Sequence, residues 1–343
     1  MPSDLDEIAL AAWLKTTVPA LGKAIGLERF SGGQSNPTYR LRTEHGAFVL
    51  RRRPFGQLLT SAHSVDREYR LITALYPVGY PVPRPIVLCS DKSVVGAVFY
   101  IMDMVNGRGF WDGHLPELAP ADRRRVYESM VDTLARLHSI AIEPVGLQEF
   151  GRPGNYFARQ VERWQQQYRA SQTEESPQID DLINFLSKTV PEQIRTTIIH
   201  GDYRVDNLIF ADDRVEIIAV LDWELSTLGD PMADFTYFAL NWVMPNTISR
   251  ASMGGLDLPA LGIPTLDEIT ERYCIASGLA KPPRLEWYFA FNLFRTIGIA
   301  QGVKKRLLDG NAAGAHPEAA VQALPQLITS ALEFAELAGA AVA

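Results

Sequence analysis

The stretch IIHGDYRVDNLIF at residues 198–210, followed by AVLDWE at residues 219–224, decides the fold of this chain. Two apolar, β-prone runs each deliver an acidic residue to a loop, and Asn207 follows Asp202 in the first loop. Phosphoryl transfer needs a carboxylate that orients a hydroxyl, together with hard oxygen ligands that hold Mg²⁺ against the phosphates. Asp202 suits the first role, and Asn207 and Asp222 suit the second. The stretch therefore predicts a site for a metal-bound polyphosphate.

The spacing His-x-Asp-x-x-x-x-Asn, followed by a strand that ends in Asp, resembles the catalytic core of the protein-kinase-like superfamily. More narrowly, His200-Gly201-Asp202 with LDWE at residues 221–224 and GDP at residues 229–231 resembles the aminoglycoside phosphotransferase family of small-molecule kinases. FVLRRRP at residues 48–54, VGL at 145–147 and QVERW at 160–164 resemble the branch that is fused to, or encoded with, acyl-CoA dehydrogenases. The resemblance covers most of the chain. It implies a bilobal α+β fold, with an antiparallel β-sheet plus a helix in the N-terminal lobe and a mainly helical C-terminal lobe.

Length and composition are compatible with such an enzyme. The 343 residues suffice for two lobes of ordinary size, and the net charge of −7 argues against a nucleic-acid partner. Cys89 and Cys274 lie far apart, so they predict neither a disulfide framework nor a zinc site. The acidic N-terminus and the lack of an apolar run of membrane-spanning length predict a soluble, cytoplasmic protein without a membrane partner.

The first lobe offers residues for the nucleotide. The segment FSGGQSNPTYRL at residues 30–41 places Gly33 and Ser35 where backbone N–H groups would cover phosphates, although a Gly-Gly turn is by default only a hairpin. By the resemblance, Arg51 stands where kinases carry the lysine that holds the α- and β-phosphates, and Glu68 on the next helix is its partner. Arginine is not equivalent to lysine, but it remains a permanent cation that binds phosphate. A solvated strand end is the alternative interpretation of Arg51.

The link between the lobes is expected at Asp103-Met-Val105-Asn-Gly107, where the backbone of Asp103 and Val105 would contact the adenine of ATP. A plain exit from a strand into a loop is the alternative. We therefore predict a nucleotide-binding lobe over residues 1–105 and a catalytic, substrate-binding lobe over residues 106–343.

The second lobe supplies the remaining candidates. Arg204 would neutralise charge on the transferring phosphoryl group. His200, Asp230 and Asp234 are expected to be scaffold, with Asp230 or Asp234 anchoring the catalytic loop by accepting backbone hydrogen bonds. A basic and aromatic segment before and along a polar helix is a candidate grip for an anionic or adenine-bearing substrate, with Arg159, Arg163 and Trp164 as its members. Solvated helix surface is the alternative for each of the three.

Periodicity predicts the elements around these residues. Helices are expected within residues 5–26 and at 64–75 with Ser64 as cap, 120–138, 235–242, 285–306 and 319–338. Strands are expected at 47–51, 86–88 and 94–102, and an irregular excursion at 245–265.

We predict an ATP- and Mg²⁺-dependent kinase of a small hydroxylated molecule. A nucleotide-binding pseudokinase is one alternative, supported by Arg51 in place of lysine, and a metal-dependent hydrolase built on His200, Asp202 and Asp222 is another. An aminoglycoside is a poor acceptor for the basic stretch from Arg152 to Arg169, because aminoglycosides are polycations. The resemblance instead implies a hydroxyacyl-CoA as acceptor and a functional link to an acyl-CoA dehydrogenase.

Overall fold

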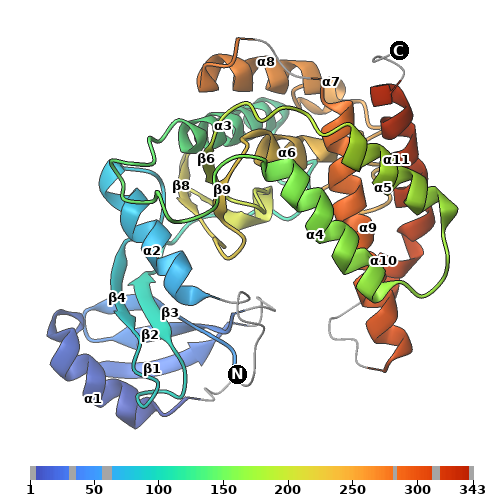
Figure 1. The fold of residues 1–343 in the computed structure, drawn as a ribbon. Helices are drawn as coiled ribbons and strands as arrows, with labels where there is room; N and C mark the ends of the chain where they lie inside the picture. Colours follow the sequence, from blue (N-terminus) through green and yellow to red (C-terminus); the bar gives the residue numbers. More distant parts are fainter. Residues whose placement is uncertain (1–4, 31–35, 56–63, 281–283, 311–316, 340–343) are drawn as a thin grey trace. The chain divides into compact units, whose positions relative to one another are not determined.

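The computed structural model describes residues 5–30, 36–55, 64–280, 284–310 and 317–339 (Figure 1). Contacts within the chain divide it into two units. Unit 1 comprises Met1–Gly109, Ile142–Phe150 and Asp206–Ser226, and unit 2 comprises Phe110–Ala141, Gly151–Val205 and Thr227–Ala343. The lobe boundary expected between residues 105 and 106 stays a prediction.

The main sheet of unit 1 has five strands in the order β1-β2-β3-β5-β4, each antiparallel to its neighbours. The strands are β1 (Ala24–Arg29), β2 (Thr38–Thr43), β3 (Gly46–Arg52), β4 (Pro85–Cys89) and β5 (Phe99–Asp103). Along β3, Phe48, Leu50 and Arg52 are buried, so Arg51 projects from the opposite face. The register pairs Arg51 with Thr38 on β2 and with Tyr100 on β5. The sheet thus fixes the position from which Arg51 reaches its partners.

Two helices accompany this sheet. Leu10 and Leu14 of α1 (Glu7–Thr17) join the core cluster that contains Leu50 and Ile101. Helix α2 (Val65–Leu75) packs against β4 and β5, and its buried residues recur at helical spacing: Val65, Glu68, Leu71, Ile72 and Leu75. Glu68 therefore lies on the same stripe as the apolar side chains that dock the helix.

A short hairpin of β7 (Leu208–Phe210) and β8 (Ile217–Val220) also belongs to unit 1. Arg108 and Phe210 exchange two backbone hydrogen bonds of 2.8 Å, and the amide of Val220 donates to the carbonyl of Pro81 at 2.7 Å. A Cβ atom on Gly107 would lie 2.3 Å from the carbonyl oxygen of Phe210, so this close approach requires glycine. These contacts tie the hairpin that precedes Asp222 to the rest of unit 1.

Unit 2 is mainly helical. Its long helix α9 (Glu286–Leu308) packs against α4, α5, α6, α10 and α11, and Figure 1 shows α9 running beside α11. The other helices formed by the described residues of unit 2 are α3 (Pro120–His138), α4 (Tyr156–Ser171), α5 (Pro177–Lys188), α6 (Met232–Val243), α7 (Leu258–Leu261), α8 (Leu266–Ser277), α10 (Pro317–Gln322) and α11 (Leu324–Gly339). Strand β6 (Thr197–Ile199) pairs antiparallel with β9 (Thr227–Gly229). An antiparallel sheet with a helix in one unit and a helical second unit confirm the predicted α+β class.

Several boundaries differ from the prediction. Residues 24–26 begin β1 rather than ending a helix, and the run expected as a strand from residue 94 turns at Gly96, so that β5 begins only at Phe99. The segment expected as one helix over 319–338 is split into α10 and α11. The side chain of Ser64 makes no capping hydrogen bond to α2, because it is engaged by Arg53 and Asp66.

None of the helices formed by the described residues combines the length and the apolar character needed to span a membrane.

Candidate active site

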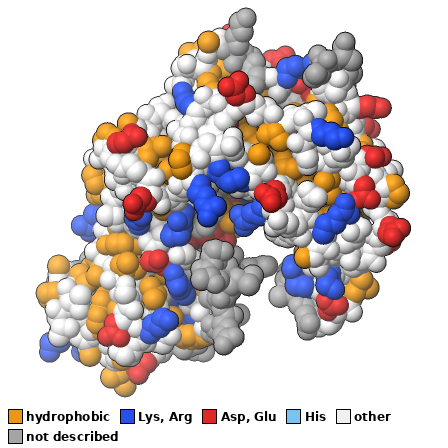
Figure 2. All heavy atoms as spheres, viewed as in Figure 1, with side chains coloured by type: hydrophobic (Ala, Val, Ile, Leu, Met, Phe, Trp, Pro, Cys, Tyr) orange, Lys and Arg blue, Asp and Glu red, His pale blue; other side chains and the backbone are white. Residues whose placement is uncertain are grey.

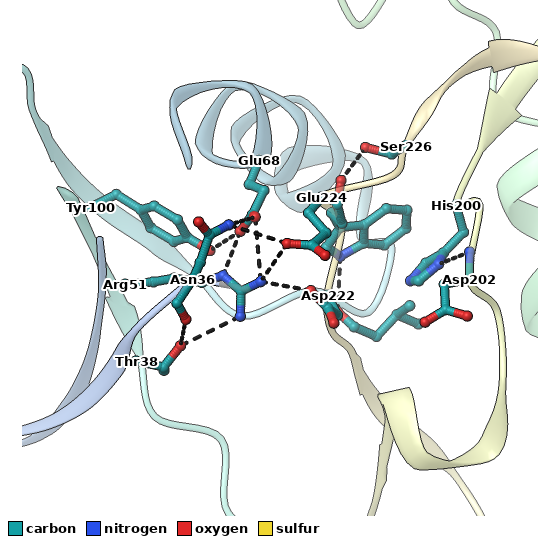
Figure 3. A network of polar contacts seen from close by, with 12 residues as sticks. Asn36, Thr38, Arg51, Glu68, Tyr100, His200, Asp202, Asp222, Glu224 and Ser226 are labelled. Carbon is teal, nitrogen blue, oxygen red and sulfur yellow. Dashed lines mark hydrogen bonds and ion pairs between the residues drawn. The ribbon is translucent and has the colours of Figure 1, made fainter. Parts of the chain in front are cut away.

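Arg51 lies at the centre of a network of ionic contacts in unit 1 (Figure 3). Arg51 Nε lies 2.8 Å from Glu68 Oε2, and Arg51 Nη2 lies 2.6 Å from Asp222 Oδ1 and 3.8 Å from Glu224 Oε2. Tyr100 Oη donates to Glu68 Oε2 at 3.0 Å. One guanidinium thus joins the sheet, α2 and the segment after β8. A planar fork with several donors is suited to such bridging, whereas an ammonium is a point charge.

Asn36 closes this network on the side of β2. Its amide nitrogen donates to Glu68 Oε1 at 2.9 Å and to Glu224 Oε2 at 3.3 Å. Asn36 and Glu68 are both buried, at 1% and 2% exposure. A buried carboxylate requires partners of this kind, because an uncompensated charge in the interior is costly.

The acidic side chains of the network stabilise the positive charge of Arg51. Burial disfavours the guanidinium, but Glu68, Tyr100, Asp222 and Glu224 together raise the pKa of Arg51 above its ordinary value. Burial raises the pKa of Glu68, and the charge of Arg51 opposes that rise. Arg51 is therefore a fixed cation at any pH at which the protein is folded, and its position in the pair with Glu68 matches the expected one.

Asp222 adopts an unusual backbone conformation, with φ at +63°. Few residues other than glycine adopt positive φ, and Asp is among those that tolerate it best. The segment around it is held by two hydrogen bonds: the Leu221 amide donates to the Asn207 carbonyl at 2.8 Å, and Trp223 Nε1 donates to the Val220 carbonyl at 3.0 Å. This conformation directs the carboxylate of Asp222 toward Arg51.

The residues of unit 1 fit a divalent cation. Carboxylate oxygens of Glu68, Asp222 and Glu224 lie within 4.8 Å of one another, and Asn207 is joined to the same segment through its backbone. Carboxylate and amide oxygens are the ligands that Mg²⁺ prefers. Arg51 is paired with the same acidic cluster, so a cation bound there would compete with this guanidinium for Asp222.

The loop of Asp202 lies in unit 2, where Asp234 holds it. Asp234 Oδ2 accepts from the His200 amide at 2.6 Å, and Oδ1 accepts from the Gly201 amide at 2.8 Å. Gly201 has φ of +88°, a conformation that explains glycine at this position of the motif. Asp230 instead accepts from the amides of Met232 and Ile194, both at 2.8 Å. Of the two candidates that the sequence left open, Asp234 is the one that contacts this loop directly.

Asp234 is itself secured by a buried histidine. His138 Nε2 lies 3.3 Å from Asp234 Oδ2, and His138 Nδ1 lies 2.6 Å from Tyr273 Oη. Burial alone would raise the pKa of Asp234, but His138, His200 and the Gly201 amide hold it below its ordinary value. Asp234 is therefore an ionised support of the loop.

The carboxylate of Asp202 is oriented by a tyrosine. Tyr237 Oη donates to Asp202 Oδ1 at 2.9 Å, and the Asp202 amide donates to His200 Nδ1 at 3.2 Å. Burial, with the charge of Asp202, raises the pKa of Tyr237 to about 12, so the phenol keeps its proton. Arg295 lies over the Tyr237 ring at 4.7 Å and donates to the Gly201 carbonyl at 2.9 Å. Asp202 thus has a fixed direction within unit 2.

The residues of α4 that the sequence predicts as substrate contacts already interact with other parts of the protein. Arg159 donates to the carbonyls of Arg152 and Gly154, which fastens the turn before its own helix. Trp164 is nearly buried, with the guanidinium of Arg295 at 5.7 Å from its ring and that of Arg163 at 6.0 Å. On the face shown in Figure 2, basic side chains stand among acidic and hydrophobic ones.

The expected adenine contacts lie at the end of β5. The Asp103 amide already donates to the Arg84 carbonyl at 2.9 Å, and the Asp103 carboxylate pairs with the Arg84 guanidinium at 2.8 Å. Val105 follows in the irregular segment beyond the strand. Gly33 and Ser35 lie outside the described residues.

Asn36, Tyr100, Tyr237 and Arg295 are among the residues of the site that the sequence analysis did not name. Tyr237 follows Asp234 by three positions on α6, so helical spacing places the two on neighbouring faces and was a usable signal. The other three reach the site through tertiary packing, which a single sequence does not reveal.

Comparison with known proteins identifies the family. The sequence profile of the phosphotransferase enzyme family matches residues 26–287. The mouse protein named acyl-CoA dehydrogenase family member 10 is 41% identical over 314 residues, which cover 91% of this chain and 29% of that protein. The human acyl-CoA dehydrogenase family member 11 is 38% identical, over 89% of this chain and 40% of that protein. The chain therefore spans well under half the length of these relatives.

Solved structures agree with this assignment. A Ralstonia eutropha protein described as a candidate aminoglycoside phosphotransferase is 39% identical, with a TM-score of 0.88 over 97% of this chain and 98% of that one. Spectinomycin phosphotransferase, solved with ADP and spectinomycin, shares the fold at 13% identity, with a TM-score of 0.64 over 97% of this chain and 99% of that one. The predicted protein-kinase-like fold is thereby confirmed. The chain belongs to the phosphotransferase enzyme family.

Proposed function

We propose that the protein transfers the γ-phosphoryl group of Mg-ATP to a hydroxyl group of a small molecule. The observation that carries this proposal is the junction of Arg51 with Glu68 and Asp222, since it joins a phosphate-binding cation to a carboxylate suited to Mg²⁺. ADP in the spectinomycin phosphotransferase structure supports ATP as the phosphate donor.

In this proposal Arg51 binds the phosphates and Glu68 keeps the guanidinium in place. Asp222 and Asn207 hold Mg²⁺, which supplies positive charge that orients the phosphates and offsets the charge of the transition state. The backbone of Asp103 and Val105 contacts the adenine. Because the Asp103 amide is already bonded to the Arg84 carbonyl, we assign this contact to the Asp103 carbonyl, which would accept from the exocyclic amine.

Asp202 orients the acceptor hydroxyl and takes its proton, and Arg204 offsets charge on the phosphoryl group. Tyr237 supports this role, because its donated hydrogen bond fixes the direction of the Asp202 carboxylate. Positioning of this kind provides most of the catalysis in phosphoryl transfer, since the chemistry needs little covalent participation by the protein.

We further propose a hydroxyacyl-CoA as the acceptor, in the cytoplasm and in functional connection with an acyl-CoA dehydrogenase. The names of the mouse and human relatives support this proposal, because both refer to acyl-CoA dehydrogenases. Phosphorylation would turn the hydroxyl of a hydroxyacyl thioester, a poor leaving group, into a good one. Arg163 and Trp164 are the proposed contacts to the CoA portion, whereas Arg159 is occupied by the turn at Arg152 and Gly154.

A coupled assay of ADP release tests the proposal. The enzyme is given Mg-ATP with hydroxyacyl-CoAs, sugars, amino alcohols and aminoglycosides in turn, and Asp202→Ala serves as the control. We expect turnover on hydroxyacyl-CoAs that is lost in the variant. Turnover on aminoglycosides alone would show that the acceptor is an aminoglycoside rather than a hydroxyacyl-CoA. Tight binding of Mg-ATP without turnover of any of these compounds would favour the pseudokinase.

A further inference from the structure

A cavity of about 380 Å³ lies within unit 2. It opens between α6, α9, α10 and the start of α11. Apolar side chains form most of its walls, among them Leu240, Met244, Ile299, Ala300, Ala323 and Leu327. The volume lies within the range of about 300–1,000 Å³ that is usual for small-molecule pockets.

Two residues connect this cavity to the catalytic loop. Tyr237 lines it and also donates to Asp202 Oδ1 at 2.9 Å. Arg204, two positions after Asp202 in the same loop, lines it as well. A molecule whose hydroxyl is held by Asp202 therefore has the cavity within reach of its next few atoms.

The chemistry of the walls selects the occupant. Among the described residues no Asp or Glu lines the cavity, and Arg204 is its single ionic side chain. A polycationic acceptor would gain nothing from such walls and would be repelled by Arg204. A hydrocarbon chain gains from every methylene that leaves water, and an acidic or acyl group on the same molecule suits the guanidinium.

We propose that this cavity is the subsite for a hydrocarbon chain of the phosphate acceptor. This inference rests on the proposed function and adds to it that the length of the chain determines specificity. Ile299 lies in the wall of this apolar cavity and is 46% exposed. A hydrocarbon chain bound in the cavity would cover its side chain.

Binding measurements on the chain of 343 residues test the subsite without turnover. The probes are straight-chain hydroxy fatty acids and their CoA thioesters, lengthened from butyryl to decanoyl and titrated calorimetrically in the absence of ATP. We expect the affinity of at least one series to rise about fourfold per added methylene until the cavity is filled. Ala323→Phe, which fills the cavity, should remove this dependence. Ala338→Phe, on α11 but away from the walls, should keep it.

The outcomes separate this inference from the proposed function. Affinity that is independent of chain length in both series, or a length dependence that survives Ala323→Phe, would overturn the subsite even if hydroxyacyl-CoAs are phosphorylated. A length dependence that Ala323→Phe removes would support the subsite even if no acceptor is turned over. A change of oligomeric state in Ala323→Phe with unaltered chain binding would assign the cavity to a subunit interface and also overturn the proposal.

Discussion

Arg51 Nη2 lies 2.6 Å from Asp222 Oδ1, so the cation expected to bind phosphate is paired with the carboxylate expected to bind metal. The same guanidinium is held by Glu68 from α2. Two opposite charges at this distance attract strongly wherever water is partly excluded. In the proposed function Asp222 would bind Mg²⁺ in competition with Arg51, and the phosphates of the nucleotide would give Arg51 another partner.

This relationship predicts how metal binds without nucleotide. Arg51→Met leaves Glu68, Asp222 and Glu224 close together without their cation, so we expect Mn²⁺ to bind the nucleotide-free variant at least about tenfold more tightly than the wild type. Electron paramagnetic resonance of free Mn²⁺ measures this. Arg53→Met is the control, because Arg53 pairs with Asp66 outside the cluster. Equal Mn²⁺ affinity in wild type and Arg51→Met would refute the competition.

Substitution of Glu68, the buried carboxylate of the network, is predicted to lower the stability of the protein. Glu68→Gln removes one partner of a nearly buried pair, which typically costs about 3–5 kcal/mol of the free energy of unfolding. The KM for ATP should rise as well, because Arg51 loses its support. Urea unfolding and ATP kinetics measure the two effects. Asp66→Asn on the same helix breaks a more exposed pair and should cost no more than about 1 kcal/mol, so equal losses in the two variants would contradict the prediction.

Tyr237 predicts a selective effect on catalysis. Tyr237→Phe deletes a hydrogen bond to the Asp202 carboxylate, and bonds to charged groups contribute about 1.5–3 kcal/mol, so kcat should fall by roughly 10-fold or more. The KM for ATP should not change, since Tyr237 contacts Asp202 and is not among the proposed ligands of the nucleotide. Steady-state kinetics with varied ATP measures both constants. Tyr76→Phe, at an exposed position, is the control; an unchanged kcat in Tyr237→Phe would remove Tyr237 from the account.

Asp234 predicts a pH dependence of stability. Its pKa is lowered in the folded protein, so the unfolded chain binds the proton more readily. The contribution of Asp234 to the free energy of unfolding is therefore fully present at pH values above its ordinary pKa of 3.8. It is lost as the pH falls through the lower pKa of the folded protein. Asp234→Asn should reduce stability at neutral pH by about 3 kcal/mol and flatten the acid limb. Urea unfolding midpoints measured from neutral pH down to below pH 3.8 give both the loss of stability and the change in its acid dependence. Asp213→Asn, at an exposed position, is the control. An acid limb as steep as in the wild type would contradict the assignment.

Local signals explain how much of the fold the sequence predicted. Helix α3 has its predicted limits because apolar residues recur at helical spacing from Pro120 to His138, and β3 follows the β-prone run before Arg51. For the strand expected at 94–102 only the start was wrong: Gly96, at φ of +82°, lies in a bend that apolar content alone does not reveal, and β5 begins at Phe99. Propensity also could not show that residues 24–26 leave the helix for a sheet edge.

The site shows the same division. Arg51 and Glu68 were predicted as a pair from the order of elements, and they lie in contact. That Asp234 rather than Asp230 holds the loop depends on where two backbone amides point, and Tyr237 and Arg295 reach the loop from helices α6 and α9. Such contacts between distant segments follow from packing and have no local signature.

The most direct test of phosphoryl transfer with Asp202 as base is ³¹P nuclear magnetic resonance of the products. Wild type and Asp202→Asn are each incubated with Mg-ATP and a hydroxyacyl-CoA, and binding of Mg-ATP is measured beside the reaction. The account predicts a new phosphate monoester with the wild type and none with the variant, at equal affinity for Mg-ATP. Monoester formed by Asp202→Asn at the wild-type rate would contradict it, as would release of inorganic phosphate alone by the wild type.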